Sequence, residues 1–333
     1  MGCNLAIAGV TGAVGQEFLR ILEERDFSFD SLKMLASSRS AGKKIEFKGK
    51  EYTVEELTKK SFSNIDIALF SAGASRSKEF GPAAVEAGAV VVDNSSAFRM
   101  DPEVPLVIPE INPQAIKEHK GIIANPNCST IIGIVPVWPL HKANPVKRLI
   151  VSTYQAASGA GHSAMVELEE QSREILDGKE PTCKAFPYQI AFNIFSHNAS
   201  LGPNGYNQEE TKMVHETRKI FDCADIAITC TCIRIPVFRA HCESINLEFT
   251  EAITPDQVRD LLSTAPGVSL IDDRENNRFP MPIDASGKDD IYVGRIRQDE
   301  SLPENRGINI WVAGDQLRKG AALNAVQIAE KLL

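Results

Sequence analysis

The sequence lacks any apolar stretch close to the ~20 residues that a membrane-spanning helix needs. The opening residues, MGCNLAIAGVTG, lack the basic segment and long apolar core of a secretory leader. A basic excess is also missing, because the formal net charge is -8, which argues against a nucleic-acid partner. We therefore expect a cytoplasmic protein that binds neither membrane nor nucleic acid.

Cysteine is sparse and odd in number, with seven residues scattered along the chain. In a cytoplasmic protein this pattern indicates reduced thiols rather than a disulfide framework. Cys230, Cys232, His241 and Cys242 could be imagined as zinc ligands, but their spacing misses the usual ligand pattern. Cys230 and Cys232 alternate on a predicted strand and share a face, which favours packing. We predict no metal site.

The length of 333 residues suggests two domains of about 150 residues each. The first part alternates apolar strands and helices, which is typical of a doubly wound, Rossmann-type α/β fold. Its predicted strands are 4–8, 32–36, 65–70, 89–92 and 121–124, and its predicted helices are 13–24 and 77–87.

The second part has an α+β pattern, with strands that alternate as antiparallel strands do. Its predicted strands are 147–154, 226–235, 244–249 and 308–313, and its predicted helices are 163–176, 209–221 and 317–333. The last helix should dock on the first domain. We therefore expect a dinucleotide-binding domain of residues 1–127 with 316–333, and a catalytic and dimerisation domain of residues 128–315. Residues 181–207, rich in Pro, Asn, Gly and Phe, are predicted to be irregular and to form an interface; we call them the arm.

A glycine-rich loop, Gly9 to Gly15, lies between the first strand and the first helix. Such a loop turns tightly and brings a pyrophosphate to the helix N-terminus, although a plain strand-to-helix turn is the simpler alternative. An NAD site usually carries an acid about 20 residues further on. Here that position holds Arg39 between Ser38 and Ser40, with no acid. A guanidinium and hydroxyls suit a 2′-phosphate, so we favour NADP over NAD, against the alternative of a solvated basic turn.

Cys128 follows an apolar strand and Pro126 and precedes the run STII, which predicts a position at the start of a helix. The helix dipole and unpaired N–H groups there stabilise a thiolate; a buried structural cysteine is the alternative. A thiolate nucleophile needs a base, and His241, near Arg234 among short strands, is the best candidate of six histidines. We expect its pKa to lie near neutrality, as general acid–base work prefers.

Several motifs occur together and in order: GVTGAVGQ, SSRSAG, DNSSAFRMD, NPNCST, YQAASGAG, EETK, RIPVFRAHCES and GDQLRKGAA. Along nearly its full length the chain resembles the aspartate-β-semialdehyde dehydrogenase family. The resemblance implies NADPH-dependent reduction of aspartyl-4-phosphate to aspartate semialdehyde and phosphate through a thioester on Cys128. It also implies a place in the pathway to lysine and diaminopimelate, threonine, methionine and isoleucine, and a homodimer or homotetramer.

The resemblance further implies a role for each matching residue. The catalytic residues are Cys128, His241 and Gln155. Substrate and phosphate are bound by Arg99, Asn127, Gln155, Glu209, Lys212 and Arg234. The cofactor is bound by Gly9, Thr11, Gly12, Ala13, Val14, Ser38, Arg39, Ser40, Ser71, Ser158, Gly159 and Gln316. Within the substrate set, Arg234 clamps the carboxylate, Glu209 contacts the amino group, and Lys212 and Arg99 hold the phosphate. A helix salt bridge between Glu209 and Lys212 is the alternative.

Two other functions stay open at this point. N-acetyl-glutamyl-phosphate reductase shares the fold and chemistry but takes an acylated amine; Glu209 argues against it, because a carboxylate favours a free ammonium. The second alternative is a non-catalytic module that binds NADP or a metal.

Overall fold

The apolar runs of the first part form one parallel sheet in the computed structural model, which describes residues 2–333. Within those residues the sheet runs in the order β5 (Glu55–Glu56), β2 (Phe29–Ala36), β1 (Cys3–Ala8), β6 (Ile67–Phe70), β7 (Val90–Asp93) and β8 (Ile122–Ala124). All neighbouring pairs are parallel. The order reverses at β1, as in the doubly wound dinucleotide-binding fold, so the predicted fold class is confirmed.

Helices cover both faces of this sheet, which explains why its strands are apolar throughout. They are α1 (Ala13–Glu24), α2 (Ala74–Glu86) and α8 (Leu323–Glu330). Ile7 of β1 is buried in one core with Phe18 of α1 and Val326 of α8. The next residue, Ala8, faces the other core with Ala84 of α2. This alternation is the period of a strand buried on two sides.

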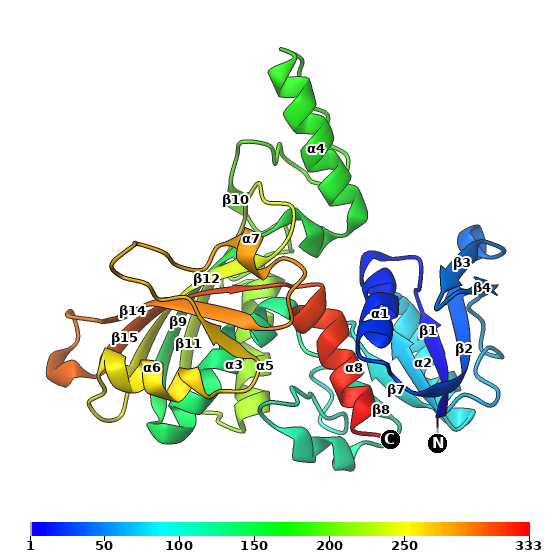
Figure 1. Cartoon of the computed structure of the whole chain (residues 1–333), viewed down its shortest axis with the longest axis horizontal. Coiled ribbons are helices and arrows are strands. Elements are labelled where there is room, and N and C mark those ends of the chain that lie inside the picture. Colours follow the sequence, from blue (N-terminus) through cyan, green and yellow to red (C-terminus); the bar gives the residue numbers. More distant parts are fainter. Residues whose placement is uncertain (1) are drawn as a thin grey trace. The chain divides into compact units, whose positions relative to one another are not determined.

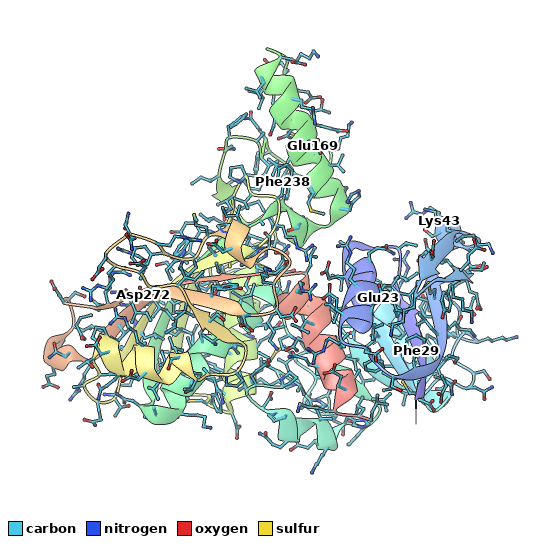
Figure 2. All side chains as sticks on the ribbon, in the orientation of Figure 1. Glu23, Phe29, Lys43, Glu169, Phe238 and Asp272 are labelled. Carbon is cyan, nitrogen blue, oxygen red and sulfur yellow. The ribbon has the colours of Figure 1, made fainter. Side chains whose placement is uncertain are left out.

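A small hairpin, β3 (Lys44–Phe47) and β4 (Lys50–Thr53), follows β2. It was not predicted, because exposed lysines and glutamates hide its strand pattern. Phe47 stacks on Phe29 with ring centroids 6.1 Å apart, and Figure 2 labels Phe29 and Lys43 in this region. The hairpin thus buries two aromatic rings next to the sheet.

The second unit is built on a seven-stranded mixed sheet within the described residues. Its order is β10 (Phe195–Ser196), β11 (Ala227–Arg234), β9 (Val146–Gln155), β12 (His241–Phe249), β15 (Gly307–Gly314), β14 (Ile291–Gln298) and β13 (Val268–Leu270). We expected antiparallel pairing throughout, but β9 and β11 are parallel. The reason is topological: α4, the arm and α5 separate the two strands, and this long connection returns the chain in the same direction.

Three of the second unit's helices cover one face of this sheet, and the short helix that contains Ala285 packs on the other face. The helices of the second unit are α3 (Cys128–Ala143), α4 (His162–Leu176), α5 (Gln208–Phe221), α6 (Pro255–Ser263) and α7 (Pro282–Ala285). Figure 1 shows α3, α5 and α6 side by side beneath the strands, and α3 contacts both other helices. On the opposite face, Tyr154 and Trp311 pack together but stay half-buried. That face therefore keeps apolar surface within reach of a partner.

The arm is irregular, as predicted, apart from the short strand β10. Its Phe186 and Ile190 pack on Leu168 of α4 in a small separate core. Figure 1 shows α4 standing out from the seven-stranded sheet with the arm beside it, and Figure 2 labels the exposed Glu169 on this helix. The arm and α4 thus form one substructure of the second unit.

The border between the units falls after Asn127 and again between Gly320 and Ala321. Residues 316–320 therefore belong to the second unit, not to the first as we expected. The side chain of Gln316 binds within that unit, and a Cβ on Gly320 would lie 3.0 Å from the Cβ of Cys128. The predicted helix 317–333 also divides, into a π-helical turn at Arg318–Ala322 followed by α8.

No helix among residues 2–333 is both long enough and apolar enough to span a membrane.

Candidate active site

Cys128 is the first residue of α3, as predicted. The run from Ser129 to Val137 is buried and drives helix formation, although Pro136 lies within it and Pro139 follows two residues later. No acidic side chain occupies the first turn, so the helix end keeps its positive potential for an anion. Cys128 itself is half-buried. A half-buried sulfur at a helix N-terminus is placed to act as a thiolate.

His241 opens β12 and is fully buried. Its Nε2 lies 3.7 Å from Sγ of Cys128, so the structure brings together two residues that are far apart in the sequence. Its Nδ1 accepts a hydrogen bond from the Ala156 amide at 3.1 Å. A neutral imidazole accepts at one nitrogen only, so its proton is on Nε2 and faces the sulfur.

The environment of His241 opposes a positive charge. Burial, followed by the charge of Arg234, lowers the pKa of His241 to about 3. The near-neutral pKa that we expected is therefore wrong, because the sequence does not show how deeply the ring is buried. In this state the ring is a hydrogen-bond donor to sulfur rather than a base that holds the thiol proton.

Hydrogen bonds of the Gln316 side chain support the backbone next to His241. Gln316 accepts from the Ala240 amide at 2.9 Å and bonds through its Nε2 to Ser158 Oγ. Ala240 has a φ of 73°, a conformation that non-glycine residues adopt only when their surroundings hold them there. Both ends of the Gln316 amide are thus engaged within the unit, and contacts of Gln316 and Ser158 with a cofactor remain predictions.

Gln155, at the end of β9, lies beside Arg234 at the end of β11, because the parallel strands bring their carboxyl ends to the same edge. The side chain of Gln155 is buried and donates to Ser129 Oγ at 2.7 Å and to Glu209 Oε1 at 3.2 Å. Its own oxygen has no hydrogen-bond partner among the described residues. Gln155 therefore connects the first turn of α3 to α5.

Glu209 and Lys212 form an ion pair on α5, with Nζ and Oε2 3.0 Å apart. The start of this helix is fixed by a capping box, in which the side chains of Asn207 and Glu210 each accept from the other's amide at 2.9 Å. This cap holds Glu209, which is buried, against Gln155. The salt bridge that we gave as the alternative is present, and the substrate contacts of Glu209 and Lys212 stay predictions.

Arg234 is buried, and its Nη1 donates to the Ala156 carbonyl at 2.8 Å. A Cβ on Gly159 would lie 3.0 Å from this Nη1 and 3.0 Å from Cε1 of His241. Glycine at position 159 therefore leaves open the space between the guanidinium and the imidazole. The cofactor contact that we predicted for Gly159 stays a prediction; the structure shows that this residue borders Arg234 and His241.

The remaining predicted site residues lie in the first unit. Gly9 has a φ of 94°, and a Cβ there would lie 2.3 Å from the Ser71 carbonyl oxygen. At Gly15 a Cβ would meet the Gly9 carbonyl at 2.2 Å, so the loop requires glycine at both positions. Thr11 and Gly12 are exposed, Ala13 and Val14 begin α1, and Gly12 provides no side-chain cap. These free helix N–H groups and the close backbone fit a pyrophosphate.

Arg39 lies in the short 3₁₀ turn Ser38–Ser40 immediately after β2. Both Arg39 and the adjacent Ser38 are exposed. The glycine-rich loop lies next to this turn, because the Gly9 amide donates to the Leu35 carbonyl near the end of β2.

Two predicted substrate residues of the first unit are buried. Arg99 donates to the carbonyls of Asn125 and Asn94, and Asn127 lies at the end of the unit.

The cysteines on β11 pack together rather than bind a metal. Sγ of Cys230 and Sγ of Cys232 are 3.5 Å apart, and both side chains are buried. The contact with Cys232, followed by burial, raises the pKa of Cys230. All seven cysteines are free. Within residues 2–333, no group of three or more His, Cys, Asp and Glu side chains could hold a metal ion.

Glu243 is a buried acid that our sequence analysis missed. Two residues after His241 on β12, it is fully buried and neither oxygen has a hydrogen-bond partner among the described residues. A Cβ on Gly133 of α3 would lie 2.5 Å from its Oε2. Burial, followed by the nearby Cys232 and Glu209, raises the pKa of Glu243 well above its ordinary value. The glutamate is thus held in its neutral form beneath the site.

Replacing Glu243 by glutamine should change how stability depends on pH. In the folded wild type Glu243 keeps a proton that it releases in the unfolded chain. Its contribution to stability is therefore fully present below the unfolded pKa of about 4.3, and this contribution is lost as the pH rises toward the folded-state pKa. Denaturant unfolding at pH 5 and pH 8 should show a smaller loss for Glu243→Gln than for wild type. Glu251→Gln, at an exposed position, is the control; equal slopes in all three proteins would contradict a buried neutral Glu243.

A dinucleotide-binding fold and a second unit that carries a thiol–imidazole pair together define a cysteine-dependent dehydrogenase. Residues 4–119 match the semialdehyde dehydrogenase NAD binding domain, and residues 137–319 match the semialdehyde dehydrogenase dimerisation domain. The chain is 55% identical to aspartate-semialdehyde dehydrogenase from Synechocystis, over 99% of this chain and 97% of that relative. The chain belongs to the aspartate-semialdehyde dehydrogenase family.

Solved structures agree with this assignment. Aspartate-semialdehyde dehydrogenase II from Vibrio cholerae, also solved as a complex with ASA, is 46% identical, has a TM-score of 0.96, and aligns over 100% of this chain and 98% of that one. The enzyme from Candida albicans, solved with NADP, is 25% identical with a TM-score of 0.76, over 100% of this chain and 98% of that one.

Proposed function

We propose that this chain is an NADP-dependent, phosphorylating aspartate-semialdehyde dehydrogenase, which reduces aspartyl-4-phosphate to aspartate semialdehyde and phosphate. The observation that carries the proposal is the approach of His241 Nε2 to Cys128 Sγ, 3.7 Å apart at a helix N-terminus, in a chain of this family. The product feeds the pathway to lysine and diaminopimelate, threonine, methionine and isoleucine. The seven free thiols suit a reducing compartment, so we place the enzyme in the cytoplasm.

The first chemical step uses Cys128. Its thiolate, supported by the helix N-terminus and by Nε2–H of His241, attacks the acyl carbon, and the bond from that carbon to the phosphate oxygen breaks. The result is a thioester on Cys128 and free phosphate. The neutral ring already holds its proton on Nε2. The same N–H group can therefore donate a hydrogen bond first to the sulfur and then to the carbonyl oxygen, as the negative charge moves from one atom to the other.

The second step is reduction of the thioester, for which bound NADPH supplies the hydride. Nε2–H of His241 would stabilise the oxyanion that this reduction forms on the Cys128 adduct. The carbonyl then re-forms as the carbon–sulfur bond breaks, which releases aspartate semialdehyde and restores the thiolate. Gly9, Gly15 and the uncapped start of α1 would hold the pyrophosphate.

The charged residues that we assign to the substrate match its chemistry. Arg234 is the proposed carboxylate clamp, because a guanidinium can bind a carboxylate through two N–H groups. Glu209 is the proposed partner of the free ammonium, and Lys212 and Arg99 are the proposed phosphate ligands. Asn127 and Gln155 would complete the substrate contacts. The half-buried sheet face at Tyr154 and Trp311, in the region that matches a dimerisation domain, is the proposed homodimer surface.

The direct test is the reverse reaction. Purified protein should reduce NADP with aspartate semialdehyde only when inorganic phosphate is present, because phosphate is needed to release the thioester. N-acetyl-glutamate semialdehyde is the matched control substrate and should be turned over poorly, since its amine carries no charge for Glu209. Turnover of the acetylated substrate alone, or turnover of neither, would contradict the proposal.

Changing Arg39 to aspartate should reverse the cofactor preference. A charged hydrogen bond to the 2′-phosphate contributes roughly 1.5–3 kcal/mol, so KM for NADPH should rise about 10- to 100-fold. KM for NADH should change little, because NADH has no phosphate at that place. Lys60→Asp makes the same charge change at another exposed position of the unit and serves as the control. An unchanged NADPH to NADH ratio in Arg39→Asp would show that Arg39 does not read the 2′-phosphate.

A further inference from the structure

The guanidinium of Arg234 has a second neighbour, which lies outside the predicted site. His197 belongs to the arm, and its Nε2 is 2.7 Å from Nη2 of Arg234. Arg234 Nη1 is bonded to the Ala156 carbonyl, so each terminal nitrogen of the guanidinium has one protein acceptor. Its Nε is buried and has no hydrogen-bond partner among the described residues.

The arm reaches Arg234 through three separate contacts. Strand β10 pairs with β11 so that Phe195 lies opposite Arg234. The backbone amide of His197 donates to the Cys232 carbonyl at 2.9 Å, which extends this pairing. The ring of Phe186 lies 5.5 Å from Cζ of Arg234, within the range of a cation–π contact. The arm therefore contacts the guanidinium of Arg234 through the ring of Phe186 and through Nε2 of His197.

The chemistry of His197 suits an acceptor for a guanidinium. Burial, followed by the charge of Arg234, lowers the pKa of His197 to about 4, so the ring is neutral near pH 7. Its Nδ1 also faces a donor, the Ala199 amide, at 3.2 Å. A neutral ring accepts at only one nitrogen, and the charged, shorter contact with Arg234 is the stronger of the two. The one proton of the neutral ring therefore lies on Nδ1, and the charge of Arg234 opposes a second proton on Nε2.

We propose that His197 is a positioning residue for Arg234, which sets the guanidinium in the orientation that binds the substrate carboxylate. With one proton of Nη1 on Ala156 and one proton of Nη2 on His197, the guanidinium cannot rotate about its long axis without breaking a bond. Each terminal nitrogen keeps a second proton for a ligand. The inference rests on the proposed function, because it takes Arg234 as the carboxylate clamp.

The test compares two aldehydes in the reverse reaction with phosphate and NADP. Aspartate semialdehyde carries the carboxylate, whereas 3-aminopropanal has the same amine and aldehyde without it. In His197→Phe, which keeps a ring but loses the acceptor, the preference of kcat/KM for aspartate semialdehyde should fall about tenfold. Most of the fall should be in KM for that substrate, while kcat for 3-aminopropanal and KM for NADP should stay within about twofold.

Two further variants separate positioning from folding. His197→Gln can present an amide oxygen to Arg234 and should recover most of the wild-type preference, and added imidazole should do the same for His197→Ala. His215→Phe, at an exposed position of α5, should behave as wild type. An equal loss for both aldehydes, or an unchanged preference in His197→Phe and His197→Ala, would overturn the proposal. If wild type turned over neither aldehyde, the proposed function itself would be wrong, which is a different outcome.

Discussion

Replacing Cys128 by serine is expected to abolish turnover, with a loss in kcat of at least about 10³-fold. The start of α3 and Nε2–H of His241 stabilise a thiolate at position 128. A serine hydroxyl does not ionise near neutral pH, so in the variant there is no anion for these groups to stabilise. The geometry should survive, because oxygen and sulfur differ by one row and the side chain is only half-buried. Steady-state reduction of NADP with aspartate semialdehyde and phosphate measures the loss.

Two other cysteines provide the controls for this variant. Cys183 is exposed in the arm, and Cys230 is buried on β11 against Cys232. Cys183→Ser and Cys230→Ser should each keep most of the wild-type activity, since neither sulfur is assigned to the reaction. All three variants should also bind NADPH with similar affinity, as measured by fluorescence titration. A comparable loss of turnover in the three proteins would remove Cys128 from its assigned role.

The positions of the thiol and the glycine loop could be predicted from the sequence because both depend on local patterns. A helix start after Pro126 and a strand–glycine–helix unit are visible within a dozen residues. The parallel pairing of the first sheet follows from strands that alternate with helices, since parallel strands need such connections. For these parts, local patterns and general topology were sufficient.

Other parts of the site could not be predicted, because they depend on long-range packing. Nothing local to His241 indicates that the Ala156 amide fixes its tautomer, since the contact joins two strands. The buried Glu243 looks like an ordinary polar residue in an alternating strand, and its burial depends on α3. His197 lies in a segment without periodicity, where no sequence signal connects it to Arg234.

The three-residue spacing of Glu209 and Lys212 on one helix predicted their salt bridge correctly, but it did not describe how the two residues are held. The capping box at Asn207 and Glu210 and the hydrogen bond from Gln155 supply that part. The same holds for Gln316, which was expected to contact the cofactor. That contact stays a prediction, and the bonds of its amide with Ala240 and Ser158 show in addition that Gln316 supports the residue just before His241.

Replacing His241 by glutamine and by asparagine should separate its two hydrogen bonds. The longer glutamine side chain can place an N–H group where Nε2 lies, next to Cys128, whereas asparagine can place only an oxygen where Nδ1 lies, next to Ala156. Both variants lose the imidazole, so kcat should fall about 10²- to 10⁴-fold in each. A shared loss of turnover, by itself, would not distinguish the two bonds.

The reactivity of the thiol distinguishes them. If Nε2–H supports the thiolate, alkylation of Cys128 by iodoacetamide at pH 7 should stay within a few-fold of wild type in His241→Gln and slow about tenfold in His241→Asn. Mass spectrometry of the labelled peptide reports Cys128 alone, and the exposed Cys183 in the same sample is an internal control. Equal alkylation rates in the two variants would show that the N–H group facing the sulfur does not matter.

The pH dependence gives an independent check on the same arrangement. A pKa of about 3 for His241 means that the ring stays neutral in the free enzyme above about pH 4. The pH profile of kcat/KM reports the ionisations of the free enzyme. Between pH 5 and pH 8, wild type and His241→Gln should therefore show the same dependence of kcat/KM on pH. A limb near pH 6.5 that this variant removes would mean that His241 carries a proton on both nitrogens in the working enzyme. In that case the Ala156 amide could not be its partner, and the Nε2–H assignment would have to be abandoned.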